Sequence, residues 1–226
     1  METTIYIDGY NLFYGRLRNT HYKWLDLFKL FQEIIRIQNP DSKLVKVKFF
    51  TAPVKTNFAS HGQKSQHAQE SYHRALKELY GDSIEIILGY HTVEKGTPPK
   101  YLKPIDKDNR VEIWKFEEKQ SDVNLSLHMY RDAVNDFCEQ QVLVSNDSDL
   151  EFGLKLVKQD FPHIELGLII PRKKPEKEKS NRPPNKSLSQ HVKWTRHYIL
   201  DEECSDSQLP EKIPTRKKPI TKPEYW

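Results

Sequence analysis

Short apolar runs rich in β-branched residues alternate along this chain with longer segments whose apolar residues recur at helical spacing. The short runs cover residues 3–7, 44–50, 84–90, 142–144 and 164–170. The longer segments cover residues 25–37, 63–80, 120–137 and 148–160. Runs of the first kind are typical of buried strands, and a period of 3.6 is typical of amphipathic helices. Strands that alternate with helices predict an α/β fold whose central, mostly parallel sheet is covered by helices on both faces.

Residues 92–110 interrupt this alternation. They contain Gly96, Pro98, Pro99 and Pro104 and keep no sustained period. Gly and Pro at such density favour irregular structure. The sequence therefore predicts a protruding loop or irregular hairpin here, followed by a short strand over residues 111–116.

The composition changes after residue 171. A length of 226 residues fits one domain with an appendage. Residues 172–226 hold 14 basic and 8 acidic residues, so they account for the net charge of +4. Their first part is rich in Lys, Glu, Ser, Asn and Pro, a composition that does not form a core. We expect a domain over residues 1–171 and a basic, Pro-rich linker and C-terminal extension over residues 172–226, partly packed back on the domain.

Two classes of protein are disfavoured by the sequence. No run approaches the roughly 20 apolar residues of a membrane span, and the N-terminus shows no signal-peptide pattern. Cys138 and Cys204 are far apart and lack the spacing of a zinc site or a disulfide framework. We expect a cytoplasmic protein without a membrane partner.

Acidic residues follow two of the predicted strands. Asp8 and Asn11 follow the first strand, and Asp147 and Asp149 follow the run at residues 142–144. Asp122 opens the helix between them. Ligands of open α/β sheets bind beyond the carboxyl ends of the strands, so these side chains converge if the two strands are neighbours.

A group of carboxylates at short range favours a bound cation, because like charges raise one another's pKa. Hard oxygen ligands without His or Cys select Mg²⁺ or Mn²⁺. Such an ion supports the attack of water on a phosphodiester, and Asn11 could orient the water. Gly9 and Gly15 alone give neither a dinucleotide fingerprint nor a phosphate loop.

The same acidic residues also have simpler, purely structural interpretations. Asp147 or Ser148 is a natural N-cap, and Asp122 in a first helical turn is favoured by the helix dipole without any metal. Asp8 with Gly9 could form a simple turn. These alternatives stay open from spacing alone.

Three segments carry a family resemblance: YIDGYNL at residues 6–12, EKQSDVNL at 118–125 and VSNDSDL at 144–150. In this order they resemble the NYN domain, the LabA-like branch of the PIN-like nuclease superfamily. The resemblance implies a three-layer Rossmann-like (PIN-like) fold and a divalent-metal ribonuclease site. It implies that Asp8, Asp122, Asp147 and Asp149 form the acidic, metal-binding and catalytic cluster, with Asn11 as its polar companion.

The sequence thus predicts a metal-dependent endoribonuclease that hydrolyses RNA phosphodiester bonds. Tyr10 could stack a base, and the basic side chains of Lys119, Arg172, Lys173 and Lys174 could contact phosphates. One alternative is a catalytically silent nucleic-acid-binding or scaffold module. Another is a nuclease acting on structured DNA. A homo-oligomer is left open.

Overall fold

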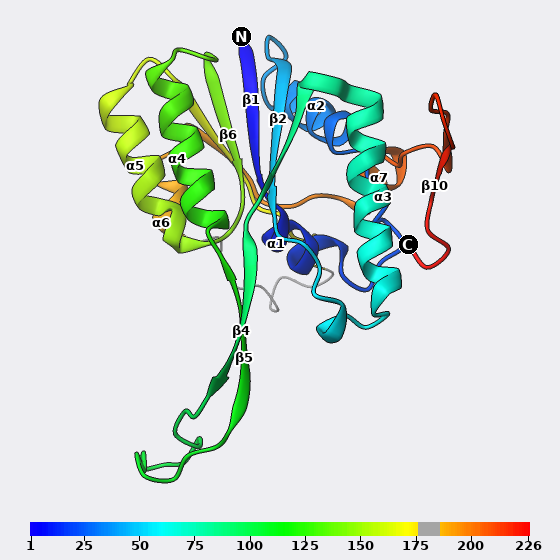
Figure 1. The fold of residues 1–226 in the computed structure, drawn as a ribbon. Coiled ribbons are helices and arrows are strands. Elements are labelled where there is room, and N and C mark those ends of the chain that lie inside the picture. Colours follow the sequence, from blue (N-terminus) through cyan, green and yellow to red (C-terminus); the bar gives the residue numbers. More distant parts are fainter. Residues whose placement is uncertain (176–185) are drawn as a thin grey trace.

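The structure, a computed structural model, describes residues 1–175 and 186–226. Its centre is a six-stranded sheet of order β3-β2-β1-β6-β7-β8, in which every neighbouring pair is parallel (Figure 1). The strands are β1 (Glu2–Asp8), β2 (Lys43–Thr51), β3 (Ile84–Leu88), β6 (Gln140–Val144), β7 (Glu165–Ile169) and β8 (Trp194–Arg196). The predicted α/β fold with a parallel central sheet is confirmed.

Helices cover both faces of the sheet, with α2 and α3 on one side and α4 and α5 on the other (Figure 1). Their bounds are α2 (Leu27–Gln38), α3 (Gln63–Tyr80), α4 (Ser121–Val134) and α5 (Glu151–Asp160). Ile5 and Ile7 of β1 belong to the core on the α2–α3 side, whereas Tyr6 between them belongs to the core on the α4–α5 side. This alternation follows from the period of two along a strand. The molecule therefore has three layers.

Short helices fill several connections. The segment after β1 forms α1 (Gly9–Leu12) and a π-helical turn η1 (Phe13–Leu17), and the segment after β2 contains η2 (Thr56–Phe58). The remaining short elements are η3 (Gly81–Ser83), η4 (Ser148–Leu150), α6 (Lys186–Ser189), α7 (Asp201–Asp206), β9 (Lys212–Ile213) and β10 (Ile220–Thr221).

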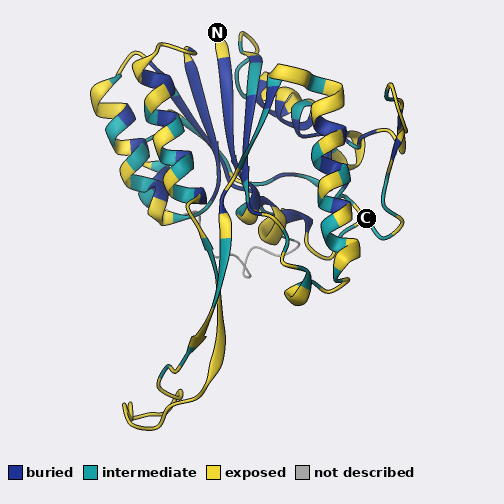
Figure 2. Cartoon of the chain, in the orientation of Figure 1, coloured by how far each residue is buried: buried dark blue, intermediate teal, exposed yellow. Residues whose placement is uncertain are grey.

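An arm projects from the body beyond the carboxyl ends of the strands (Figure 1). It consists of residues 90–119, in which β4 (Tyr90–Gly96) pairs antiparallel with β5 (Ile113–Lys119). Figure 2 shows that most of the arm is exposed, whereas the central strands are buried. The hairpin reading of this region is confirmed, and its strands are more regular than the Gly and Pro content predicted.

The C-terminal residues add to the body. β8 pairs with β7 and extends the sheet, and Ile199, Cys204 and Leu209 are buried in the core that contains α2. The part of the predicted basic linker at residues 176–185 lies outside the described residues, and the domain boundary at residue 171 stays a prediction. Within the described residues, no helix combines the length and apolar character needed to cross a membrane. The cytoplasmic location stays a prediction.

Candidate functional site

Three carboxylates meet at the carboxyl end of the sheet. We call Asp8, Asp122 and Asp147 the acidic cluster, because each offers one carboxylate oxygen that lies within 4.8 Å of the other two. β1 and β6 are neighbours, as their convergence requires. Asp149 lies outside this group of three; it is exposed, and its backbone N–H donates to Oδ1 of Asp147 at 3.0 Å.

Two members of the cluster also cap helical turns. Oδ1 of Asp8 accepts from the backbone N–H of Asn11 at 2.9 Å, and Asp147 is the N-cap of η4. The other oxygen of Asp8 accepts from Nδ2 of Asn11 at 2.7 Å and from Oγ of Ser145 at 2.8 Å. The capping reading and the convergence of the acids are therefore both correct.

Burial raises the pKa of two carboxyl groups of this cluster. It raises the pKa of Asp8, and burial together with the charges of Asp8 and Asp147 raises the pKa of Asp122 to about 6. The pKa of Glu118 is also raised by burial, although a hydrogen bond from Ser121 opposes the shift. Each of these shifts moves a carboxyl group towards the pH range in which a general acid or base is effective.

A cavity of about 630 Å³ opens beside the acidic cluster. Glu118, at the base of the arm, lines this cavity, and the charge of Asp8 adds to the effect of burial in raising the pKa of Glu118. Aromatic and imidazole rings form a large part of the lining, and we call the cavity the aromatic pocket. Its rings are Tyr10, Phe13, Tyr14, Phe49, Phe58, Tyr72, Phe116, Tyr225, Trp226, His61, His73 and His91.

Stacked rings form one wall of the aromatic pocket. The ring centroids of His91 and Phe116 are 4.6 Å apart with 15° between the planes, and those of Phe116 and Phe58 are 5.2 Å apart with 26°. Burial lowers the pKa of His73 to about 4, so this side chain is neutral at physiological pH. Burial raises the pKa of Tyr10 to about 12, so it remains a phenol that can donate a hydrogen bond. The lining therefore suits a flat ligand with a few polar groups.

Cations also face the aromatic pocket. Arg18, Lys23 and Lys55 line it, and the guanidinium carbon of Arg18 lies 5.2 Å from the centre of the Tyr14 ring. Lys23 and Lys55 form no ion pair with any carboxylate of the described residues. Their ammonium groups are available to an acidic ligand.

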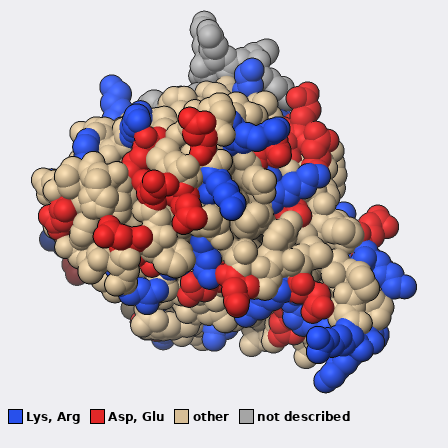
Figure 3. All heavy atoms as spheres, turned by 90° about the horizontal axis from the view of Figure 1, so that it is seen from above, with Lys and Arg blue, Asp and Glu red and all other residues tan. Residues whose placement is uncertain are grey.

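Three of the four basic side chains predicted to contact phosphates form an ion pair or a hydrogen bond within the chain. Nζ of Lys119 lies 2.5 Å from Glu117, and Nζ of Lys173 lies 3.1 Å from Asp201. Arg172 donates from Nε to the carbonyl of His197, and Lys174 is exposed. Figure 3 shows Lys and Arg interspersed with Asp and Glu on the face seen from above, without a continuous basic band. Tyr10, predicted to stack a base, lines the aromatic pocket.

Sequence reasoning missed the aromatic pocket. Its lining comes from η1, the end of β2, the η2 connection, α3 and the arm, which are far apart in the chain. No motif or periodicity joins Lys23, Lys55 and Phe116. The one available signal is the aromatic run Tyr10, Phe13 and Tyr14 directly after a strand.

Comparisons with known proteins point to oxidative chemistry. The chain is 36% identical over 244 residues to 6-hydroxy-3-succinoylpyridine 3-monooxygenase HspA from Pseudomonas putida (strain DSM 28022 / S16), an alignment that covers 100% of this chain and 75% of that protein. The fold is similar to the crystal structure of VPA0982 from Vibrio parahaemolyticus RIMD 2210633, a protein of unknown function, with a TM-score of 0.51 and 16% identity over 89% of this chain and 94% of that one. This second similarity shows the fold alone. No family model matches the chain.

The first similarity corrects the predicted function. The metal-dependent endoribonuclease, its Mg²⁺ or Mn²⁺ cofactor and the nuclease, hydrolase and RNA-binding assignments are wrong, because the full-length relative is named a monooxygenase. The two alternatives, a silent nucleic-acid-binding or scaffold module and a DNA nuclease, are not oxidative enzymes either, so this similarity does not support them. The physical reason for the error is that acidic residues at strand ends also cap helical turns in this fold. The same positions of one fold are used for different reactions in different proteins. The resemblance to the NYN domain, the homo-oligomer and the absence of a membrane partner stay predictions.

Proposed function

Because this chain belongs to the same family as 6-hydroxy-3-succinoylpyridine 3-monooxygenase HspA, we propose that it is a monooxygenase of heteroaromatic carboxylic acids. The single observation that carries the proposal is the 36% identity along the whole chain. The name of the relative describes a pyridine ring with a hydroxyl group and a succinoyl group, and oxygen insertion at ring carbon 3. A succinoyl group ends in a carboxylate, so that substrate is a flat ring with an acidic side chain.

The aromatic pocket supports this substrate class. Ligand pockets of small molecules typically measure about 300–1,000 Å³, and the aromatic pocket falls within that range. The stacked rings of His91, Phe116 and Phe58 offer a flat apolar wall to a heteroaromatic ring. Lys23 and Lys55 offer charge-assisted hydrogen bonds to a carboxylate.

The reaction needs protons and electrons. One atom of O₂ is inserted between ring carbon 3 and the succinoyl carbon, so the bond between these two carbons breaks while each forms a bond to the new oxygen. The other atom leaves as water, which consumes two electrons and two protons. Glu118 is the carboxyl group that lines the aromatic pocket, so it is placed to pass protons between ligand and acidic cluster. The electrons come from a reduced nicotinamide or reduced flavin, the cofactor classes that supply them in such reactions.

The residues after β1 do not fit a bound dinucleotide. Rossmann folds hold a pyrophosphate there on a Gly-rich turn and a helix N-terminus. Here α1 has four residues, and the N–H of Asn11 donates to the carboxylate of Asp8. A Cβ on Gly9 would lie 2.6 Å from the carbonyl oxygen of Phe50, so protein atoms fill the close approach that a phosphate would need. No step of the proposed reaction is therefore assigned to a dinucleotide at this end of the sheet.

Isotope labelling tests the proposal. The purified chain is supplied with 6-hydroxy-3-succinoylpyridine, ¹⁸O₂, reduced nicotinamide and free flavin, and the products are analysed by mass spectrometry. We expect substrate-dependent O₂ uptake and one ¹⁸O atom in the product. An unchanged substrate, or O₂ uptake that yields only peroxide with every heteroaromatic acid offered, would refute the monooxygenase assignment.

A further inference from the structure

One strand of the arm carries an exposed aromatic side chain. In the register of β4 and β5, Val93 lies opposite Phe116, and Trp114 lies two residues further along the same face, opposite Lys95. Phe116 stacks on Phe58 in the aromatic pocket, whereas Trp114 is 70% exposed. The arm thus exposes a large apolar ring, and a ribbon of two strands is marginally stable in water by itself.

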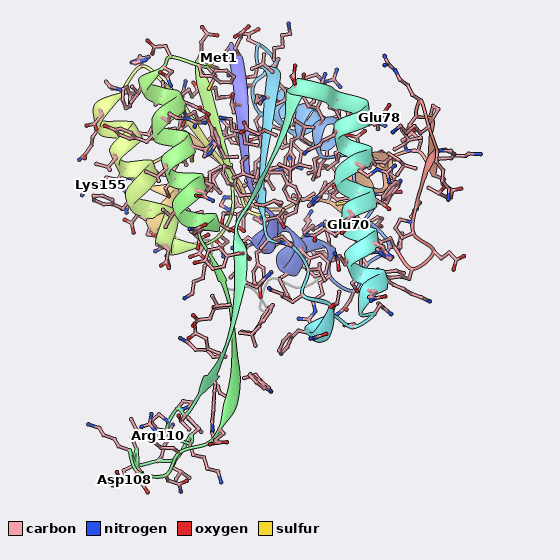
Figure 4. All side chains as sticks on the ribbon, in the orientation of Figure 1. Met1, Glu70, Glu78, Asp108, Arg110 and Lys155 are labelled. Carbon is pink, nitrogen blue, oxygen red and sulfur yellow. The ribbon has the colours of Figure 1, made fainter. Side chains whose placement is uncertain are left out.

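The connection between the two strands exposes further apolar groups. Tyr101 is 84% and Ile105 is 77% exposed. Figure 4 places Asp108 and Arg110 at the tip of the arm, so charged groups surround these apolar side chains. An apolar centre with a polar rim is the composition of a protein–protein interface.

The charges along the strands are neutralised within the arm. Lys95 lies 2.6 Å from Glu112, and Glu117 lies 2.7 Å from Lys115 and 2.5 Å from Lys119. The strands therefore present no block of one sign by which an oppositely charged protein could be selected. Permanent homodimer interfaces are more apolar than transient ones, and the exposed side chains of Tyr101, Ile105 and Trp114 supply apolar area of this kind.

Helix α4 carries a second uncovered apolar surface. Val123, Leu127 and Val134 are 60%, 61% and 56% exposed. Steps of four and seven residues place these three side chains within about 40° of one another around the helix. We call them the α4 stripe; Leu125 and Met129 point to the opposite, buried side.

We propose that the arm is a dimerisation arm, and that its exposed side chains Tyr101, Ile105 and Trp114 dock on the α4 stripe of a second copy of this chain. Each copy carries both surfaces, so one two-fold axis covers both arms and both stripes. Burying Trp114 and Tyr101 of both copies removes roughly 600–1,000 Å² from water, at about 150–250 Å² for each ring. A stable interface needs about 1,200–2,000 Å² in total, and the helix surfaces under the arms supply the remainder.

Measuring the mass in solution tests this proposal. Light scattering and sedimentation of the full chain, from low to high micromolar concentration, should give twice the mass of one chain. The arm variant Y101S/I105S/W114S should give the mass of one chain, and so should the stripe variant V123S/L127S. Ile37→Ser on α2 is the matched control, because Ile37 is 59% exposed and belongs to neither surface; it should leave the dimer intact. Circular dichroism melts report whether each variant is folded.

Mixing the two variants identifies the contact. A heterodimer of arm variant and stripe variant keeps one intact arm-to-helix contact out of two, so mixing two monomeric variants should restore a weaker dimer. A wild type that stays monomeric throughout the concentration range overturns the proposal, as does a dimer that survives the arm substitutions. A stripe variant that dimerises like the wild type, or a mixture that stays monomeric, overturns the docking on α4. Because no substrate is used, these outcomes are independent of the proposed monooxygenase activity.

Discussion

At the scale of single residues, Asp122 is held in a position that costs stability. Its pKa of about 6 lies above the ordinary value of 3.8 because of burial and the charges of Asp8 and Asp147. The folded chain therefore binds a proton on Asp122 that the unfolded chain releases between about pH 4 and pH 6, and stability falls as the pH rises through that window. We expect Asp122→Asn to raise the free energy of unfolding above pH 7 by about 1 kcal/mol, a value discounted because the side chain is partly exposed.

Urea unfolding at two pH values checks this prediction. Near pH 4 the wild-type side chain is already largely protonated, so Asp122→Asn should change little there. Asp149→Asn is the matched control, because Asp149 is an exposed acid outside the group of three converging carboxylates. An Asp122→Asn variant that is destabilised above pH 7 would mean that this carboxylate is needed by the fold.

The residues of the site differ in how far the sequence predicts them. The convergence of Asp8 and Asp147 follows from their places after two strands, once those strands are neighbours, and Asp122 opens the next helix. The positions of Lys23 and Lys55 depend instead on two irregular connections, whose paths no local pattern specifies. Residue types at strand ends indicate where a ligand binds, while the chemistry depends on groups contributed by loops.

At the scale of elements, β8 packs beside β7 because Gly167 of β7 has no side chain. A Cβ on Gly167 would lie 2.3 Å from the ring of Trp194, the first residue of β8. We expect Gly167→Ala to displace that ring and to destabilise the fold by about 1–3 kcal/mol, the usual cost of overpacking. Hydrogen exchange should show faster exchange at the backbone N–H of Lys193, which directly precedes β8 and donates to the carbonyl of Leu166 in β7.

A second glycine gives the control. A Cβ on Gly96 in the arm would meet only the side chains of Ile113 and Lys115, at 3.4 Å and beyond. Gly96→Ala should leave the unfolding midpoint unchanged within experimental error. Equal effects of the two substitutions would mean that loss of glycine flexibility, and not the contact with Trp194, determines the result.

The strands and helices with clear periodicity are the ones that the sequence predicts. The five apolar runs match β1, β2, β3, β6 and β7, and the four long helices lie where the spacing places them. The three residues of β8 are too few for any period, and their pairing depends on the space above Gly167. The interpretation of the sequence also lacked α1 and η1, although Tyr10, Phe13, Tyr14 and Leu17 recur at helical spacing. β8, in contrast, is determined by tertiary contacts that a local pattern does not contain.

At the scale of the whole molecule, the aromatic pocket joins distant parts of the chain. Tyr10, Lys55, His73, Phe116 and Trp226 all line it. A ligand that binds there binds the folded state alone, so it must raise the stability of the whole chain by mass action. The stabilisation reaches about 2.7 kcal/mol when the ligand is at a hundred times its Kd. A thermal melt can therefore detect binding without catalysis.

The last prediction uses this coupling to separate substrate binding from turnover. We expect 6-hydroxy-3-succinoylpyridine to raise the Tm, and its amide, which lacks the negative charge, to raise it less. Lys55→Gln should weaken binding of the acid by roughly 10- to 150-fold, since a hydrogen bond to a charged group contributes about 1.5–3 kcal/mol, while binding of the amide should change little. Lys174→Gln, an exposed cation that does not line the pocket, should affect neither ligand. An equal loss of affinity for the acid and the amide would mean that Lys55 shapes the pocket but does not bind the carboxylate. A Tm that neither ligand changes would mean that the substrate binds outside the aromatic pocket.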